Sequence, residues 1–93
     1  MPRPKINRRI NFDPKVKYYK PQGIPMRILE EVELLPDEVE AIRLADYEGN
    51  NQTEAAKQMK ISQSTFQRIV TKARHKIAQA MVEGKAIRID DTK

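Results

Sequence analysis

One predicted helix face carries side chains that could read the edges of nucleic-acid bases. Periodicity predicts a long helix from Gln63, and its first two turns hold amides, a hydroxyl and a guanidinium away from the apolar stripe. In the major groove of double-stranded DNA, Arg matches guanine and Gln matches adenine. No carboxylate occurs between Gln63 and Val82, whereas a merely solvated face would interleave acids with lysines. We therefore predict base-reading contacts by Gln63, Ser64, Gln67 and Arg68.

Other polar and basic residues are better placed to hold phosphates. Three cations lie further along the same helix, and two polar residues open the preceding helix, where free amide groups attract anions. Four cations near the N-terminus could follow the DNA backbone or enter a minor groove; the alternative is a solubilising tail. The predicted phosphate-binding residues are Arg3, Lys5, Arg8, Arg9, Gln52, Thr53, Lys72, Arg74 and Lys76.

A helix-turn-helix pattern over residues 50–70 would position these side chains. Asn51 can cap a short first helix, residues 60–61 form the corner, and Ser62 caps the second helix. Small inward residues in the first helix allow the two axes to approach closely. A helical hairpin with no recognition role would show the same pattern and is the alternative. The side chains expected to face inward are Ala55, Ala56, Met59, Phe66, Ile69, Val70, Ala73 and Ile77.

Two further helix boundaries can be placed from proline and glycine. Pro36 opens a helix that ends near Tyr47, with Gly49 as its stop. The long helix beginning after Ser62 continues to residue 83 and ends at Gly84.

The remaining regular structure is expected at the two ends of the domain. Residues 28–35 suit either a strand or a helical face, but residues 85–90 alternate and carry cations that complement the glutamates of the first segment. We favour a short two-stranded β ribbon that joins the chain ends, within or between subunits. Tyr18 and Tyr19 are expected in a turn packed against the domain, with base stacking as the alternative.

The charge of the chain is divided by segment. The 93 residues carry a net charge of +5. Residues 1–27 hold eight Lys or Arg against one Asp, residues 28–59 hold two against nine acids, and residues 60–93 hold eight against three. Positive charge thus gathers in particular elements, as expected of elements that face phosphate. We predict a basic, Pro-rich N-terminal arm over residues 1–27 and a single, mainly α-helical helix-turn-helix domain over residues 28–93.

Several classes of protein are disfavoured. The chain has no cysteine, so disulfides and thiolate metal sites are excluded and a cytoplasmic location is expected. No stretch approaches the roughly 20 apolar residues that span a bilayer. His75 is the only histidine, and neither a phosphate-binding glycine loop nor a metal-ligand spacing occurs. We therefore expect no enzymatic activity, no cofactor and no metal.

The second half of the long helix requires a packing partner. Its apolar stripe extends to Ala80, and Met81 and Val82 widen it. The partner is either the first helix with the N-terminal segment or the same helix of a second chain. We expect a homodimer, which would place two reading heads on a two-fold symmetric DNA site.

Four separated blocks resemble one known family. They are MPRPK, ELLPDEVEAIRLADYEG, TEAAKQMKISQSTFQRIV and ARHKIAQAMVEGKAIRI, in that order. Together they resemble an uncharacterised prokaryotic family of small predicted DNA-binding proteins, whose helix-turn-helix is similar to the last domain of bacterial sigma factors. The resemblance implies a DNA-binding fold without a known target. Lys60 stands where relatives usually have Gly at the corner, and Asn7 and Asn11 stand where many have cysteine.

The pattern thus predicts a sequence-specific double-stranded DNA-binding protein, a transcriptional regulator that reads the major groove with the helix starting at Ser62. The alternative is a protein-interaction module that binds RNA polymerase or a sigma factor without reading bases. RNA binding is disfavoured because the sequence predicts no sheet with exposed aromatics on which bases could stack.

Overall fold

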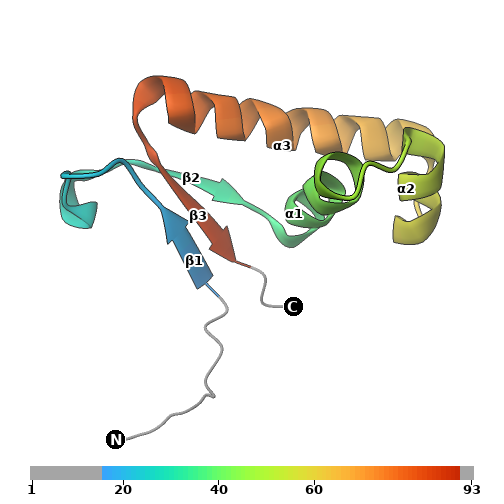
Figure 1. The fold of residues 1–93 in the computed structure, drawn as a ribbon, viewed down its shortest axis with the longest axis horizontal. Coiled ribbons are helices and arrows are strands. Elements are labelled where there is room, and N and C mark those ends of the chain that lie inside the picture. Colours follow the sequence, from blue (N-terminus) through green and yellow to red (C-terminus); the bar gives the residue numbers. More distant parts are fainter. Residues whose placement is uncertain (1–15, 91–93) are drawn as a thin grey trace, which may run out of the picture.

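The computed structural model describes residues 16–90 of the chain (Figure 1). The four N-terminal cations predicted to contact DNA, Arg3, Lys5, Arg8 and Arg9, lie outside this range. In chain order the elements are β1 (Val16–Tyr19), η1 (Met26–Ile28), β2 (Glu31–Leu34), α1 (Pro36–Ile42), η2 (Arg43–Tyr47), α2 (Gln52–Met59), α3 (Gln63–Glu83) and β3 (Ala86–Asp90).

The strands form a three-stranded sheet in the order β1-β3-β2. β3 lies in the centre, parallel to β2 and antiparallel to β1, so the last strand of the chain joins the two earlier ones. The expected pairing of the chain ends is confirmed within one subunit, and Arg88 Nη1 lies 2.8 Å from Glu33 Oε2 across the strand pair. The two-stranded ribbon is wrong in its strand count, because β1 adds a third strand from the segment assigned to the N-terminal arm.

β1 also changes the interpretation of the two tyrosines. Tyr18 and Tyr19 lie in an edge strand and are 47% and 58% exposed, whereas the sequence suggested a packed turn. The turn comes after them, before η1.

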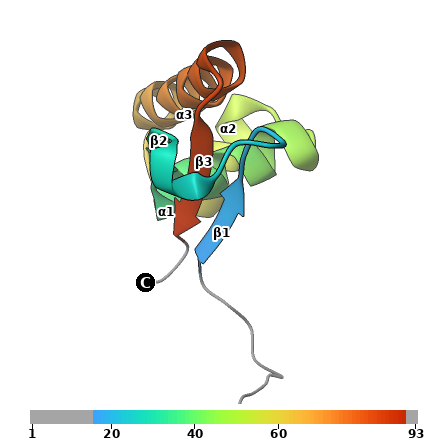
Figure 2. The same ribbon diagram turned by 90° about the vertical axis from the view of Figure 1, so that its left-hand side faces the viewer.

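One face of the sheet is covered by α3. Val32 and Leu34 of β2 are buried while Glu31 and Glu33 are exposed, as alternation along a half-buried strand requires. α3 contacts both β2 and β3, and Figures 1 and 2 show it passing over these strands. The C-terminal half of α3 therefore finds a packing partner in its own chain, and Ala80 is buried there.

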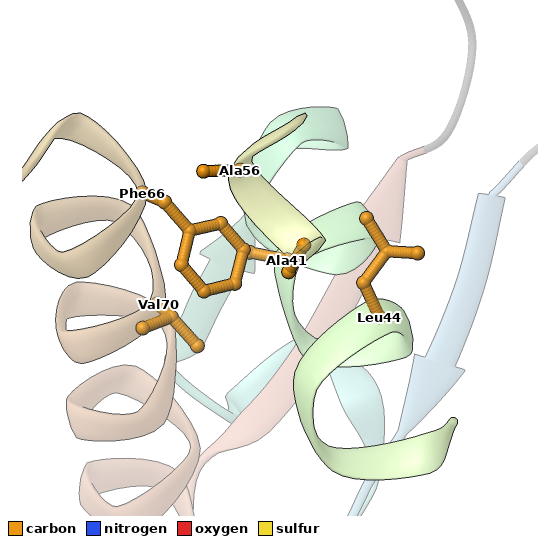
Figure 3. Close-up of a cluster of buried hydrophobic side chains, with 6 residues drawn as sticks. Ala41, Leu44, Ala56, Phe66 and Val70 are labelled. Atoms are coloured by element: carbon orange, nitrogen blue, oxygen red, sulfur yellow. The ribbon is translucent and has the colours of Figure 1, made fainter. Parts of the chain in front are cut away.

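The N-terminal half of α3 packs on the other helices. Phe66 and Val70 are fully buried with Ala41 and Leu44 from the segment α1–η2 and Ala56 from α2 (Figure 3). The expected inward positions of α2 and α3 are confirmed: Ala55, Ala56, Phe66, Val70 and Ala73 are buried, and Met59, Ile69 and Ile77 are partly buried.

The helix boundaries follow the capping residues. The Asn51 side chain accepts a hydrogen bond from the Glu54 N–H at 2.8 Å, and Ser62 Oγ accepts one from the Thr65 N–H at 3.1 Å. Gly84 ends α3 with φ +70°. Pro36 begins α1, and the helical path continues to Tyr47 through the π-helical turn η2. Three helices at the predicted places are confirmed.

Lys60 adopts the left-handed conformation at the corner between α2 and α3, with φ 61° and ψ 43°. A side chain with a Cβ is strained there, while glycine is not. We expect Lys60→Gly to raise the free energy of unfolding by up to about 1 kcal/mol, measured by urea denaturation. Lys60→Ala retains the Cβ and should leave stability nearly unchanged. Equal stability of the glycine and alanine variants would contradict this account of the corner.

Candidate nucleic-acid interface

The four residues predicted to read bases share one exposed surface of α3. Gln63, Ser64, Gln67 and Arg68 are all exposed, and they alternate with the buried Phe66 and Val70 that hold the helix on the core. This reading face, defined as these four residues, lies in the first two turns of α3. Figure 1 shows that end of α3 beside α2 and away from the sheet.

Side chains of α2 hold two glutamines of the reading face. Gln52 Nε2 donates a hydrogen bond to Gln67 Oε1, and Gln67 Nε2 donates in turn to Thr71 Oγ1 at 3.0 Å. Thr53 Oγ1 donates to Gln63 Oε1 at 3.4 Å. Gln52 and Thr53 were predicted to hold phosphates, but in the structure their side chains contact α3. The start of α2 and the start of α3 therefore form one connected polar surface.

Arg68 and Lys72 extend this surface toward α1. Arg68 Nη2 lies 3.4 Å from Thr65 Oγ1, and Arg68 and Lys72 line one shallow hollow with Asp37. Both cations are exposed, and Lys72 forms no ion pair with any residue in the described range. Lys72 is thus free to contact a phosphate beside the reading face.

Arg74 forms an ion pair with a residue of η2. Its guanidinium donates two hydrogen bonds to Asp46 of η2, at 2.7 and 3.1 Å. These bonds lower the pKa of the Asp46 carboxyl and raise that of Arg74. Because Asp46 already neutralises it, Arg74 is a weaker candidate for phosphate binding than Lys72.

The Lys76 side chain contacts a buried carboxylate and a backbone carbonyl of its own chain. Its ammonium lies 2.8 Å from Glu38 Oε1 and 2.8 Å from the Glu33 carbonyl oxygen, and the Glu38 side chain is only 3% exposed. Glu38 Oε1 also accepts a hydrogen bond from the Leu35 N–H at 2.9 Å. Lys76 joins α3 to α1 and β2 through these contacts, so its geometry is that of a structural cation and gives no support to a phosphate contact.

Two cations near the reading face were not assigned from the sequence. Lys57 lies in the last turn of α2 and Lys60 at the corner, and both are exposed. Their position in the sequence could have identified them, because both lie within six residues of Gln63, just before α3 begins.

A family model matches almost the whole chain. The family is described as "Protein of unknown function DUF134", and the match covers residues 1–92. The chain belongs to the DUF134 family.

Close relatives of this DUF134 chain occur in several bacteria, all under the name UPF0251 protein. It is 52% identical over 90 residues to the protein of Halothermothrix orenii, covering 97% of this chain and 67% of the relative. Identity is 56% to the proteins of Dehalococcoides mccartyi and Caldanaerobacter subterraneus, again over 97% of this chain and 77% and 76% of theirs. No solved structure matches this DUF134 chain.

Neither a membrane-spanning helix nor a metal-binding cluster occurs between residues 16 and 90 of the DUF134 chain. Within that part of the chain no helix is long and apolar enough to cross a membrane. In the same range no three His, Cys, Asp or Glu side chains gather as a candidate metal site.

Proposed function

We propose that this protein is a sequence-specific double-stranded DNA-binding protein and a transcriptional regulator. In this proposal α2 and α3 act as a helix-turn-helix, and α3 enters the major groove with Gln63, Ser64, Gln67 and Arg68 toward the bases. The observation that carries the proposal is the reading face itself, which is exposed, free of carboxylates and tied to α2 by hydrogen bonds.

The position of the reading face in the fold supports groove insertion. α3 contains 21 residues, so it is about 31 Å long at 1.5 Å per residue. Its C-terminal half is fixed on the sheet and its N-terminal half on α1 and α2. Because α2 and the start of α3 lie at the end of the molecule away from the sheet, a duplex could approach them without meeting the strands (Figure 1).

Arg68→Ala tests this proposal directly. A bidentate Arg–guanine contact is worth about 1 to 3 kcal/mol of discrimination. On a duplex selected by the wild-type protein, we expect Arg68→Ala to lose that preference at one base position and to retain general affinity, measured by competition binding. Arg68→Lys keeps the charge without the bidentate geometry and should also lose the preference. An Arg68→Ala variant with unchanged discrimination would remove this residue from base reading.

Lys72→Ala should act differently from Arg68→Ala. A phosphate contact contributes affinity for every sequence and releases counterions, so we expect weaker binding to all duplexes and a salt slope lower by about 1. The measurement is fluorescence anisotropy at several salt concentrations. Lys17→Ala, which removes an exposed cation from β1 of the sheet, is the matched control and should change neither quantity. An unchanged salt slope for Lys72→Ala would place Lys72 outside the interface.

The alternative proposal, a protein-interaction module for RNA polymerase or a sigma factor, has one observation in its favour. Met81 and Val82, which are adjacent in α3, are 76% and 85% exposed and could contact an apolar partner. Salt separates the two proposals, because DNA binding weakens steeply as salt rises and an apolar helix contact does not.

The homodimer remains part of the proposal. α3 already packs on the sheet of its own chain, so a second chain is not needed to bury its C-terminal stripe. The exposed Met81 and Val82 are the large apolar side chains of α3 that this intrachain packing leaves uncovered. Sedimentation equilibrium of the free protein would show whether two chains associate before DNA is added.

The positions of the tyrosines in the sheet disfavour RNA binding. The sheet does expose Tyr18 and Tyr19, which the sequence did not predict. Adjacent strand residues point to opposite faces, however, and the register aligns Tyr18 with Arg88 and Glu33. Tyr19 therefore lies on the opposite face from Tyr18, and the two rings cannot form one platform. A stacking platform needs several rings and positive charge on one face.

A further inference from the structure

The sheet face that packs toward α3 is covered unevenly. On β2 this face is buried, with Val32 8% and Leu34 3% exposed. The register places Tyr19 of β1 beside Ile87 of β3, and Ile87 beside Val32, so all three point to the same side of the sheet. Ile87 is only partly buried, and Tyr19 is 58% exposed. The cover on this face therefore becomes incomplete from β2 toward β1.

Two hollows meet at Tyr19 on this side of the sheet. The first, of about 280 Å³, lies beneath α3 between the sheet and α1, and Ile42 and Ile77 line it (Figure 1). The second, of about 420 Å³, lies between the end of β1 and the C-terminal end of α3, and Met81 lines it. Tyr19 and Ile87 line both hollows, so the two are continuous. We call them together the apolar groove, because every residue that lines the first hollow is apolar except Tyr19.

The shape of this surface is complementary to itself. A two-fold symmetric dimer uses the same patch on both subunits, so the patch must offer a projecting group and also a recess for the partner's group. The exposed Tyr19 side chain lies between two recesses of one continuous groove. Tyrosine is also among the side chains that contribute most to the stability of interfaces. The apolar groove thus combines the two features that an isologous contact needs.

The charges on the two sides of the groove are complementary as well. Lys20 follows Tyr19 directly, and residues 16–27 hold three cations and no acid. At the α1 side of the groove, Arg43 pairs with both Glu40 and Glu48, which leaves one negative charge in excess. Placing the tyrosine ring in the first hollow of a second copy brings the basic side of each chain to the acidic side of the other. The two-fold axis repeats this attraction, so it occurs twice in one dimer.

The apolar groove and the reading face lie on different parts of the molecule. No residue that lines the two hollows belongs to the reading face. Figure 1 shows α2 and the start of α3 away from β1. A partner in the groove therefore leaves the reading face of each chain open to DNA.

We infer that a second copy of this chain covers the apolar groove, with Tyr19 of each copy in the first hollow of its partner. The inference rests on the proposed function, in which the protein acts as a homodimer, and it names the surface through which that dimer forms. A small molecule fits this surface less well, because such ligands bind in sites that enclose most of their surface and both hollows are open to solvent.

Sedimentation equilibrium of the full chain and three variants tests this interface. Interfaces of standard size have micromolar or tighter dissociation constants, so at roughly 100 µM the wild-type protein should have twice the 10.8 kDa mass of one chain. Tyr19→Ala should raise the dimer dissociation constant at least about thirtyfold, the effect of losing one dominant interface side chain. Tyr19→Phe keeps the ring and should remain dimeric. Val39→Phe fills the first hollow from α1, so it should also produce a monomer.

Tyr18→Ala is the matched control. Tyr18 lies on the same strand and is 47% exposed, but it points to the opposite face of the sheet, so its removal should leave the dimer dissociation constant unchanged. Circular dichroism of each variant establishes that it is folded.

The contrary outcomes separate this interface from DNA binding. A monomeric wild-type protein at that concentration, or a folded Tyr19→Ala protein that dimerises like wild type, would overturn the inference. If such a protein still selects a defined DNA site, the DNA-binding proposal stands without this interface. A wild-type dimer that Tyr19→Ala dissociates but that retains no duplex DNA would support the inference and remove the DNA-binding proposal.

Discussion

Phe66→Ala is expected to lower the free energy of unfolding by about 3 to 5 kcal/mol, the range found when a buried aromatic is truncated. Phe66 is fully buried and lies in the hydrophobic cluster where α1, α2 and α3 meet (Figure 3). Its neighbours Ala41, Ala55 and Ala56 are small, so they cannot extend into the space that the ring leaves. The measurement is urea denaturation followed by circular dichroism.

Phe66→Leu is the matched control. It leaves a smaller cavity, so its cost should be closer to 1 kcal/mol. The variants also bear on the site, because Phe66 lies between Gln63 and Gln67 and fixes α3 against α2. A Phe66→Ala protein as stable as wild type would mean that the three helices are not joined at this residue.

Lys76→Met is expected to lower the free energy of unfolding by about 3 kcal/mol, since it leaves a buried carboxylate without its counter-ion. Glu38 is 3% exposed and has the Lys76 ammonium at 2.8 Å. The double variant Lys76→Met with Glu38→Leu should recover most of the loss, because replacing both charges by apolar groups removes the unpaired charge. Thermal or urea unfolding of the two variants would measure the difference.

Lys76→Met also distinguishes a structural role of Lys76 from a phosphate contact with DNA. If Lys76 only holds α3 to α1 and β2, Lys76→Met measured well below its unfolding temperature should bind DNA with the wild-type salt slope. The contrary pattern, full stability with a slope reduced by about 1, would return Lys76 to the phosphate-binding set.

The helices were predictable because their signals are local. Asn51, Ser62 and Gly84 each act within one turn of the helix end that they fix, and the fixed φ of proline at residue 36 suits the first turn of a helix. The inward and outward faces of α3 follow from its period for the same reason. The pairing of β2 with β3 could also be predicted from the sequence, since Glu33 and Arg88 carry complementary charges.

β1 was not predictable in the same way. Residues 16–19 read VKYY, too short to show alternation, and prolines lie on both sides at residues 14 and 21. The strand exists because β3 offers an open edge on the side away from β2, which is a property of the folded sheet.

The partners of the cations were unpredictable for a related reason. Arg74 meets Asp46 and Lys76 meets Glu38, pairs that lie 28 and 38 residues apart in the chain. Helix periodicity gave no means of knowing which acids α1 and η2 would bring to these cations. Lys72 therefore remains as the cation of α3 beyond Arg68 that is best placed for phosphate.

The division of charge along the chain follows from these ion pairs. Several acids of residues 28–59 form ion pairs, among them Arg74–Asp46, Lys76–Glu38 and Arg88–Glu33. The reading face at the start of α3 receives none of these acids as a partner. The fold thus neutralises the cations that lie against α1, η2 and β2, and it leaves an unpaired polar and basic surface on α3 between Gln63 and Lys72.

Selection and sequencing of random duplex DNA bound by the purified protein near physiological salt tests the central claim most directly. The account predicts enrichment of a defined site, with two mirrored half-sites about one helical turn apart if the protein binds as a dimer. It also predicts that Arg68→Ala loses one position of that site. Recovery of unenriched DNA would contradict sequence-specific reading by α3, and recovery of no DNA would favour the protein-interaction module.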